Sequence, residues 1–202
     1  AIIMKLRTLQ NIPVRKLRGT RVLVRLDLNA PIVGGRLESA DMWKLKSSVK
    51  TIDYLSHYGA KVIIVSHFGR PNGKKDTKTS LKPILKKFGQ MVGHKIELWT
   101  QHPEKLEVRS KKLGDGQVVA LENIRWHKGE ESCNLTFSKQ LAKLADIYVD
   151  DAFGVIQRPH ASNYGVTKYL PSYAGFLLEY EVKRLYNLIP RADRPIVAIM
   201  GG

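Results

Sequence analysis

Three arginines, Arg70, Arg125 and Arg158, lie in polar segments that each follow an apolar, β-branched run of the sequence. A guanidinium group presents a rigid fork of donors that matches the oxygens of phosphate or carboxylate. If the three groups converge, they form a pocket for a strongly anionic small molecule. A single arginine is equally well explained by a weak surface ion pair, so the prediction rests on the position that all three share.

Polar residues that suit a hydroxylated ligand accompany these arginines. Asp27 and Asn29 are two positions apart in an extended segment, so their side chains point to the same side. Their carboxylate and amide oxygens can accept hydrogen bonds from ligand hydroxyls, and His67 can donate one to a carboxylate or phosphate. Together with the arginines, they predict a binding site for a small, hydroxylated metabolite with two anionic groups.

An alternation of strands and helices positions these side chains. Strands are expected over Thr20–Leu28, Ala60–His67, His94–Trp99, Gly116–Leu121, Ala145–Asp151 and Arg194–Met200. Helices are expected over Ala40–Tyr58, Ser80–Gly93, Ser138–Asp146 and Ala174–Ile189, with Ser80 and Ser138 as caps.

This alternation predicts an α/β fold: a three-layer, Rossmann-like domain with a mostly parallel sheet flanked by helices. In such sheets ligands bind at the carboxyl ends of the strands, beside a switch in strand order. The polar segments follow the expected strands, so we expect them to meet in one crevice at that edge.

Composition excludes several classes of protein. The chain has 202 residues, of which 43% are hydrophobic and 26% charged, as is usual for a globular protein. No apolar run is long enough to span a membrane, and the N-terminal residues lack the features of a secretory signal. The single cysteine, Cys133, excludes a disulfide framework. These features predict a cytoplasmic protein without membrane association.

The formal net charge of +16 favours anionic partners, such as nucleic acid, acidic lipid or a phosphorylated metabolite. The charge is spread along the chain without an RNA-binding motif or an aromatic stacking platform, which disfavours nucleic acid. Neither of the glycine-rich nucleotide motifs is present, so a dinucleotide-dependent dehydrogenase is disfavoured as well. The histidines show no metal-ligand spacing, and no metal site is predicted.

Several of these segments resemble motifs of the phosphoglycerate kinase family. "RVLVRLDLNAP" resembles its R-V-D-F-N-V-P opening, and "VSHFGRPNG" its S-H-L-G-R-P-x-G motif. Further matches are "SLKP", "ALENIRWHKGEE", "YVDDAFGVIQRPHAS", "AGFLLEYE" and "RPIVAIMGG". They occur in the family order over nearly the whole chain.

The resemblance implies the N-terminal half of a two-domain glycolytic enzyme. In that family the N-terminal domain binds 3-phosphoglycerate and the C-terminal domain binds Mg-ATP or Mg-ADP. Hinge closure then aligns 1,3-bisphosphoglycerate and ADP for phosphoryl transfer. We expect residues 1–186 to form the substrate-binding domain, and residues 187–202 to begin the interdomain region and the first strand of a missing nucleotide-binding domain. Alone, the chain is expected to bind substrate without catalysing transfer, and to bind no cofactor.

The resemblance also assigns roles to individual residues. Asp27 and Asn29 match the family's substrate contacts, and His67 and Arg70 match its H-x-G-R pair. The two further arginines that grip the phosphate correspond to Arg125 and Arg158.

Two positions depart from the family pattern. The catalytic arginine of the first helix is replaced here by Lys44, whose flexible point charge would steady a transferring phosphoryl group less well. Ile156–Gln157 replaces an Ala-His pair before Arg158. An alternative therefore stays open: a non-catalytic relative that binds nucleic acid or other anionic partners. The abrupt end at Gly202 fits either a truncated enzyme or a separately made half.

Overall fold

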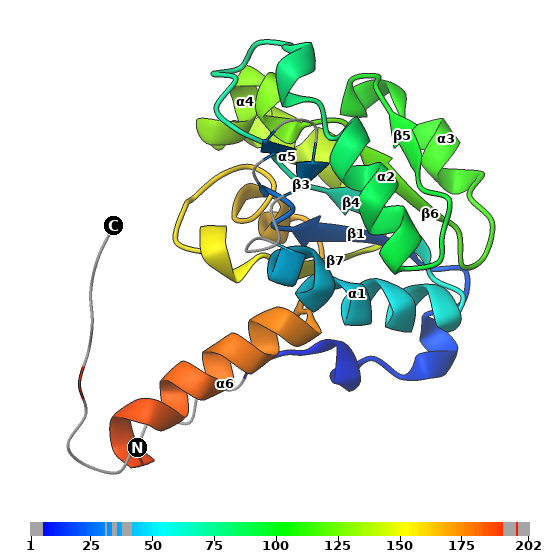
Figure 1. The fold of residues 1–202 in the computed structure, drawn as a ribbon. Helices are drawn as coiled ribbons and strands as arrows, with labels where there is room; N and C mark the ends of the chain where they lie inside the picture. Colours follow the sequence, from blue (N-terminus) through cyan, green and yellow to red (C-terminus); the bar gives the residue numbers. More distant parts are fainter. Residues whose placement is uncertain (1–5, 31, 34–35, 38–41, 192–196, 198–202) are drawn as a thin grey trace.

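The computed structural model describes residues 6–30, 32–33, 36–37, 42–191 and 197 (Figure 1). Its centre is a six-stranded sheet in the order β5-β6-β4-β1-β7-β8, and every pair of neighbouring strands is parallel. The strands are β1 (Arg21–Leu26), β4 (Lys61–Val65), β5 (Glu97–Trp99), β6 (Val118–Leu121), β7 (Ile147–Asp151) and β8 (Ser172–Ala174). The predicted Rossmann-like α/β fold is confirmed.

Helices cover both faces of the sheet (Figure 1). One face carries α1 (Met42–His57) and α2 (Lys82–Met91). The other carries α3 (Glu107–Lys111), α4 (Lys128–Glu131) and α5 (Leu135–Ala142). A last helix, α6 (Phe176–Arg191), contacts α1 and extends away from the sheet, and a small separate hairpin joins β2 (Ile32–Val33) to β3 (Arg36–Leu37).

The alternation of side chains along β1 creates two cores. Val22 and Val24 pack in the core under α1 and α2, whereas Leu23 packs in the core under α3 and α5. Because successive side chains of a strand lie on opposite faces of the sheet, Arg25 lies on the same face as Leu23. The strand therefore carries a charged side chain into the second core, at its carboxyl end.

Most of the predicted elements are confirmed, with boundaries shifted by a few residues. The expected cap at Ser138 is wrong: α5 begins earlier, and Asn134 caps it by accepting a hydrogen bond from the Phe137 backbone at 3.0 Å. Ser80 precedes α2, where its hydroxyl accepts a bond from the Lys82 backbone at 3.2 Å. The short elements β2, β3, β8, α3 and α4 were not predicted, because so few residues establish no periodicity.

The expected strand Arg194–Met200 lies outside the described residues except for Val197, which belongs to no strand and is exposed. The proposed domain boundary after residue 186 falls within α6, and this division of the chain stays a prediction. In the described part of the chain, no helix has the length and apolar character needed to cross a bilayer.

Candidate functional site

The carboxyl ends of β1, β4, β6 and β7 lie beside one another in the sheet. The chain passes from β1 to β4 on one side, and later places β7 on the other side of β1. This is a switch in strand order, which leaves a crevice between the segments that follow the two flanking strands. The sequence-predicted site residues follow these strands.

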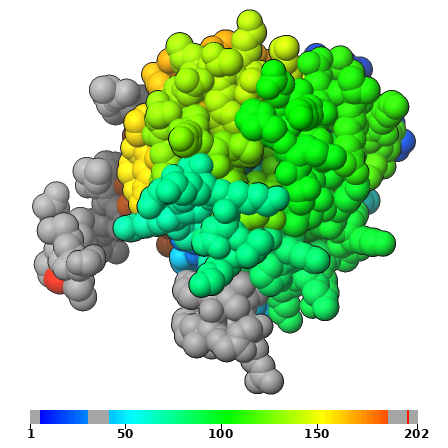
Figure 2. All heavy atoms as spheres, turned by 90° about the horizontal axis from the view of Figure 1, so that it is seen from above, coloured from blue at the N-terminus to red at the C-terminus, as the bar shows by residue number. Residues whose placement is uncertain are grey.

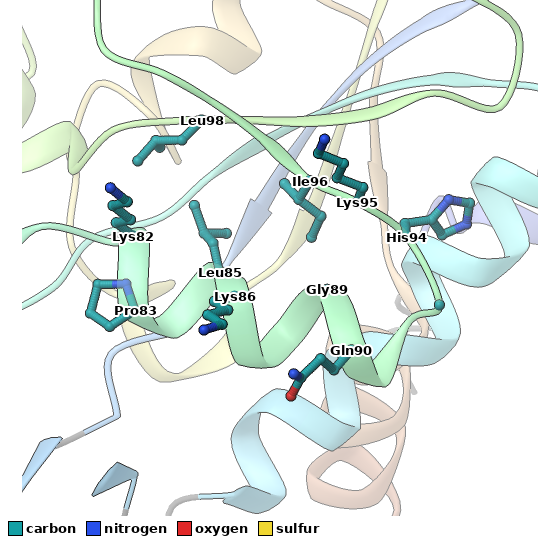
Figure 3. A pocket seen from close by; sticks show the side chains of 11 residues that line it. Lys82, Pro83, Leu85, Lys86, Gly89, Gln90, His94, Lys95, Ile96 and Leu98 are labelled. Atoms are coloured by element: carbon teal, nitrogen blue, oxygen red, sulfur yellow. The ribbon is translucent and has the colours of Figure 1, made fainter. Parts of the chain in front are cut away.

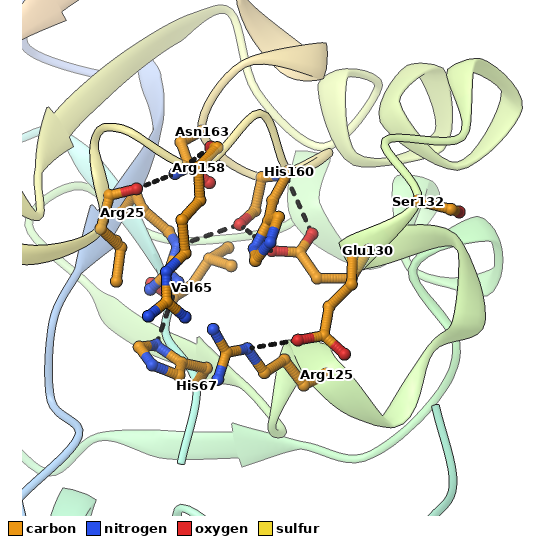
Figure 4. A network of polar contacts seen from close by, with 12 residues as sticks. Arg25, Val65, His67, Arg125, Glu130, Ser132, Arg158, His160 and Asn163 are labelled. Carbon is orange, nitrogen blue, oxygen red and sulfur yellow. Dashed lines mark hydrogen bonds and ion pairs between the residues drawn. The ribbon is translucent and has the colours of Figure 1, made fainter. Parts of the chain in front are cut away.

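Arg25 and His67 form the centre of the site (Figure 4). Arg25 is fully buried, and its Nη2 lies 3.1 Å from His67 Nδ1. Its other donors bond to the Ser162 hydroxyl at 2.9 Å and to the Leu26 carbonyl at 2.5 Å. Because a guanidinium only donates, His67 Nδ1 must accept, and the proton of a neutral His67 ring resides on Nε2.

The electrostatics keep His67 neutral. Burial lowers the pKa of His67 well below its usual value, and the positive charges of Arg25, Arg125 and Arg158 lower it further. At neutral pH the ring therefore offers a single Nε2–H donor. An anion bound beside it would oppose the effect of the arginines and raise the pKa of His67.

Arg125 presents a donor with no partner in the described structure. The side chain is buried, its Nη1 donates to the Gly69 carbonyl at 3.0 Å, and its Nε lies 3.3 Å from a Glu131 carboxylate oxygen. Its Nη2 is also buried and makes no hydrogen bond there. Leaving a buried charged donor unpaired is unfavourable by about 1–3 kcal/mol or more, and a ligand oxygen would satisfy it.

Arg158 adds a third cation from the loop after β7. Its charge lowers the pKa of both His67 and Arg125, so it belongs to the same cluster. Figure 4 shows the guanidinium groups of Arg125 and Arg158 directed toward the His67 ring. The loop is held by the Asn163 amide, which donates to the carbonyls of Val155 at 2.8 Å and Arg158 at 3.0 Å.

A buried carboxylate offsets part of this charge. Glu130 is fully buried and accepts hydrogen bonds from the backbone and hydroxyl of Ser162 at 2.9 and 2.6 Å. Burial raises the pKa of Glu130, and Arg25 and the Ser162 bonds oppose that shift. His160 Nδ1 lies 3.9 Å from the same carboxylate. Ser162 thus links the buried anion to Arg25, which bonds to the same hydroxyl.

Asp27, Asn29 and Arg70 lie beside this cluster on the neighbouring turns. Asn29 Oδ1 accepts a hydrogen bond from the Gly69 backbone at 3.0 Å, and Asp27 Oδ1 accepts one from the Asn29 backbone at 3.3 Å. The Asn29 oxygen therefore holds the turn, and the assignment of Asn29 to substrate binding stays a prediction. Arg70 follows Gly69 and is exposed to solvent.

Gly69 gives this turn its shape. Its φ of +62° lies in the left-handed region, and an added Cβ would lie 3.2 Å from a Thr79 methyl carbon. Its carbonyl accepts from Arg125 while its amide donates to Asn29. The glycine between His67 and Arg70 thus connects the two halves of the site through its backbone.

Lys44 lies in the first turn of α1, which begins near the carboxyl end of β1 (Figure 1). It is half-buried, and its carbonyl accepts a hydrogen bond from the Ser48 hydroxyl at 3.3 Å. Its catalytic assignment stays a prediction. Ile156 and Gln157, the other departure from the family pattern, are exposed just before Arg158.

The segment Leu121–Glu131 also supports the site as a scaffold. Asn123 donates from its amide to the carbonyls of Phe68 and Thr79 at 2.7 and 2.8 Å, and so holds both ends of the loop between them. Glu122 accepts bonds at 2.7 Å from the Ser80 hydroxyl and the Leu81 backbone. Figure 2 shows this loop in teal, lying against the yellow-green residues of α4 and α5.

Sequence reasoning missed Arg25, Glu130 and Ser162, and expected a supporting or structural role for His160 near the polar segments. A signal for Arg25 was present: an arginine inside the apolar run "RVLVRL" has to be buried on one face of a strand. No comparable signal marked Glu130, because a glutamate in a short polar segment is usually exposed.

Acid is expected to destabilise the chain through a second histidine, His127. Burial and the neighbouring His102 lower the pKa of His127 to about 4. An unfolded chain, with a pKa of about 6.5, then binds the proton first, so stability is complete above pH 6.5 and falls as the pH decreases toward 4. With solvent screening at its partly exposed ring, we expect a loss of about 1–2 kcal/mol.

Urea unfolding between pH 7.5 and 4.5 tests this effect. H127Q removes one of the titrating rings and should make the pH dependence of stability less steep, and H57Q, which replaces an exposed histidine at the end of α1, is the control. If the free energy of unfolding falls equally steeply with pH in H127Q and in the parent chain, His127 does not cause the loss of stability in acid.

Comparison with known proteins identifies the family of this chain. The family model described as phosphoglycerate kinase matches residues 11–202. A phosphoglycerate kinase of Synechococcus elongatus is 45% identical over 202 residues, covering 98% of this chain and 50% of that protein. A phosphoglycerate kinase of Borreliella burgdorferi is 40% identical over 185 residues, covering 91% of this chain and 47% of that protein.

Solved structures give the same result. The phosphoglycerate kinase structure from Coxiella burnetii superposes with a TM-score of 0.83 at 30% identity, over 95% of this chain and 47% of that chain. The structure of the enzyme from Pyrococcus horikoshii superposes with a TM-score of 0.79 at 28% identity, over 94% of this chain and 47% of that chain. The chain spans about half the length of the relatives it matches. The chain belongs to the phosphoglycerate kinase family.

Proposed function

We propose that this chain is the substrate-binding, N-terminal half of a phosphoglycerate kinase, and that it holds 3-phosphoglycerate or 1,3-bisphosphoglycerate for reversible phosphoryl transfer with ADP. One observation carries the proposal: the buried, unpartnered Nη2 of Arg125 lies in a cluster with Arg25, Arg158 and neutral His67. Such a cluster needs a bound anion to be satisfied.

The two sides of the site suit the two ends of the substrate. A phosphate has three oxygens for the guanidinium groups of Arg125 and Arg158 and for the Nε2–H of His67. Asp27 and the Asn29 amide lie on the adjacent turn, where a hydroxyl group would meet them. Arg70, exposed on the same turn, would attract the ligand through solvent.

The chemistry assigned to these residues is positioning and neutralisation of charge. Phosphoryl transfer needs an aligned donor and acceptor and stabilisation of the phosphoryl oxygens, without a covalent intermediate on the protein. ATP or ADP and Mg²⁺ are proposed to bind to a C-terminal nucleotide-binding half, this chain's partner domain. On this proposal the chain alone binds substrate and does not catalyse transfer.

Calorimetric titration with 3-phosphoglycerate tests the proposal. We expect saturable binding that weakens as salt is raised, because charge pairing dominates recognition. Inorganic phosphate at equal concentration is the matched control and should bind more weakly, since it lacks the carboxylate and hydroxyl groups. Absence of heat at millimolar 3-phosphoglycerate would overturn the proposal. A nucleic-acid gel shift at physiological salt that excess 3-phosphoglycerate leaves unchanged would favour the alternative.

Replacing Lys44 with arginine is expected to raise the rate of phosphoryl transfer. The planar fork of arginine donates to two phosphoryl oxygens in one fixed geometry, whereas lysine presents a point charge on a flexible stem. The measurement is a coupled kinase assay on this chain fused to the C-terminal half of the Synechococcus elongatus relative. We expect K44R to increase kcat about tenfold or more with little change in KM. K46R, which changes a lysine on the opposite side of α1, should have no effect on kcat. A K44R rate equal to that of the parent fusion would refute the role assigned to residue 44.

A further inference from the structure

A second concave surface lies away from the basic cluster, between α2 and the edge strand β5 (Figure 3). This α2–β5 groove has a volume of about 840 Å³ and is lined by residues of α2 and of the segment from Gly93 to Leu98. It lies on the face of the sheet that α1 and α2 cover, whereas Arg25 and His67 belong to the opposite face. Its volume is in the usual range for small-molecule pockets, about 300–1,000 Å³.

The walls of the groove are apolar. Figure 3 shows Leu85 of α2 directed toward Ile96 and Leu98 across the groove. Ile96 and Leu98 are only partly buried, so their free surfaces would gain from contact with an apolar ligand. Gly89 lets the two walls approach, because a Cβ there would lie 2.7 Å from the His94 carbonyl.

The charged residues that line the groove are all lysines: Lys82 and Lys86 from α2, and Lys95 from the facing segment. The helix α2 itself contains no acidic residue. Glu97 lies between Ile96 and Leu98, but alternation along β5 directs it to the other face, where it pairs with Arg109 of α3. The positive charge of the groove is therefore not offset by its lining residues.

We propose that the α2–β5 groove binds a small, soluble amphipathic anion, with one carboxylate or sulfonate head group and an unbranched apolar tail. The tail lies between Leu85, Ile96 and Leu98, and the head group pairs with the lysines that line the groove. The positive charge of the lysines selects an anion. The apolar walls select a ligand with an apolar tail, unlike the small polar anion assigned to the basic cluster. The two sites are independent of each other.

Titration with decanoate, below its micelle concentration, tests the proposal on the full chain. Octanoate, decanoate and dodecanoate should bind with affinity that rises about fourfold per added CH₂ group, the factor that corresponds to about 0.8 kcal/mol per buried CH₂. Excess 3-phosphoglycerate should not displace them. Decanol, with the same tail and no charge, should bind at least tenfold more weakly than decanoate.

Charge reversal locates the site. The triple variant K82E/K86E/K95E should lower the affinity for decanoate at least tenfold, whereas K139E, on α5 at the opposite face, should leave it unchanged. The melting temperature of each variant verifies that it is folded.

Three results would overturn the proposal: affinity independent of chain length, equal binding by the triple variant and the parent, or displacement of decanoate by 3-phosphoglycerate. The remaining arm concerns membranes. Sedimentation with anionic phosphatidylserine vesicles should leave the chain in the supernatant; cosedimentation that the triple variant abolishes would assign the groove to a lipid surface instead.

Discussion

Replacing Arg125 with alanine is expected to lower the affinity for 3-phosphoglycerate about 100-fold or more. Arg125 is buried and its Nη2 has no hydrogen-bond partner in the described structure, so on the proposed function its truncation removes a contact with the ligand. Loss of one partner from a buried, hydrogen-bonded charge pair has an effect of about 2–5 kcal/mol. Titration calorimetry of R125A against the parent chain measures this difference.

The conservative variant R125K separates charge from geometry. Lysine retains the positive charge but cannot bond to the Gly69 carbonyl and to a ligand with the same planar fork. We therefore expect an intermediate loss of about tenfold. R15A, which removes an exposed arginine of the first segment, is the matched control and should bind as the parent does. An R125A affinity within threefold of the parent value would exclude Arg125 from the binding site.

Replacing Arg25 with methionine is expected to lower the free energy of unfolding by about 3–5 kcal/mol. The change leaves buried His67 Nδ1 without its donor and removes the bond to the Ser162 hydroxyl. The Leu26 carbonyl also loses a bond, but it still accepts one from the Ser66 hydroxyl at 2.9 Å. It also removes a cation that lowers the pKa of two carboxyl groups, buried Glu130 and half-buried Asp150. Urea denaturation at pH 7 measures the loss.

The pH dependence of this loss identifies its cause. In R25M the uncompensated charges of Glu130 and Asp150 are removed when these groups take up protons. The difference between the variant and the parent should therefore shrink as the pH falls from 7 to 5. R25K should lose less stability than R25M, because lysine keeps the positive charge and a hydrogen-bond donor group.

R21M provides a control within the same strand. Arg21 pairs with Asp146, whose side chain is 47% exposed against 15% for Arg21, and it also donates to the Ser110 hydroxyl and the Lys143 carbonyl. Because solvent reaches this pair, we expect R21M to destabilise the fold less than R25M does. If R25M is no less stable than R21M, the buried network does not stabilise the fold.

Local sequence patterns were sufficient for five of the six strands of the sheet, all but β8, and for the strand ends at which the candidate site lies. The β-branched runs that became β1, β4, β6 and β7 are recognisable because a strand buried on both faces is apolar throughout. Each run ends at a change to polar residues, so Asp27, His67, Arg125 and Arg158 could be assigned to strand ends before any contact was known. Parallel strands bring their carboxyl ends to one edge, which explains why these predictions met in one place.

The partners of these residues could not be obtained in that way. Asn29 was expected to present its oxygen to a ligand, but the oxygen accepts a bond from Gly69, 40 positions away in sequence. Asn123 and Glu122 belonged to a recognisable motif, and only the folded chain shows that they hold the loop after β4. Ser138 carried a plausible capping signal, yet Asn134 four residues earlier forms the cap because the helix begins there.

The amino-acid order thus determined the α/β class, the strand ends that carry the chemistry and the excess of positive charge, since all three follow from composition and periodicity within short windows. The protonation of His67, the burial of Glu130 and the α2–β5 groove were decided by tertiary structure alone. The physical reason is that each depends on groups distant in sequence: Arg25 bonds to Ser162, 137 positions away, and Ser162 in turn holds Glu130. A shifted pKa, a buried charge and a groove all depend on groups that are close in space but distant in sequence. A local sequence pattern contains no information about such groups.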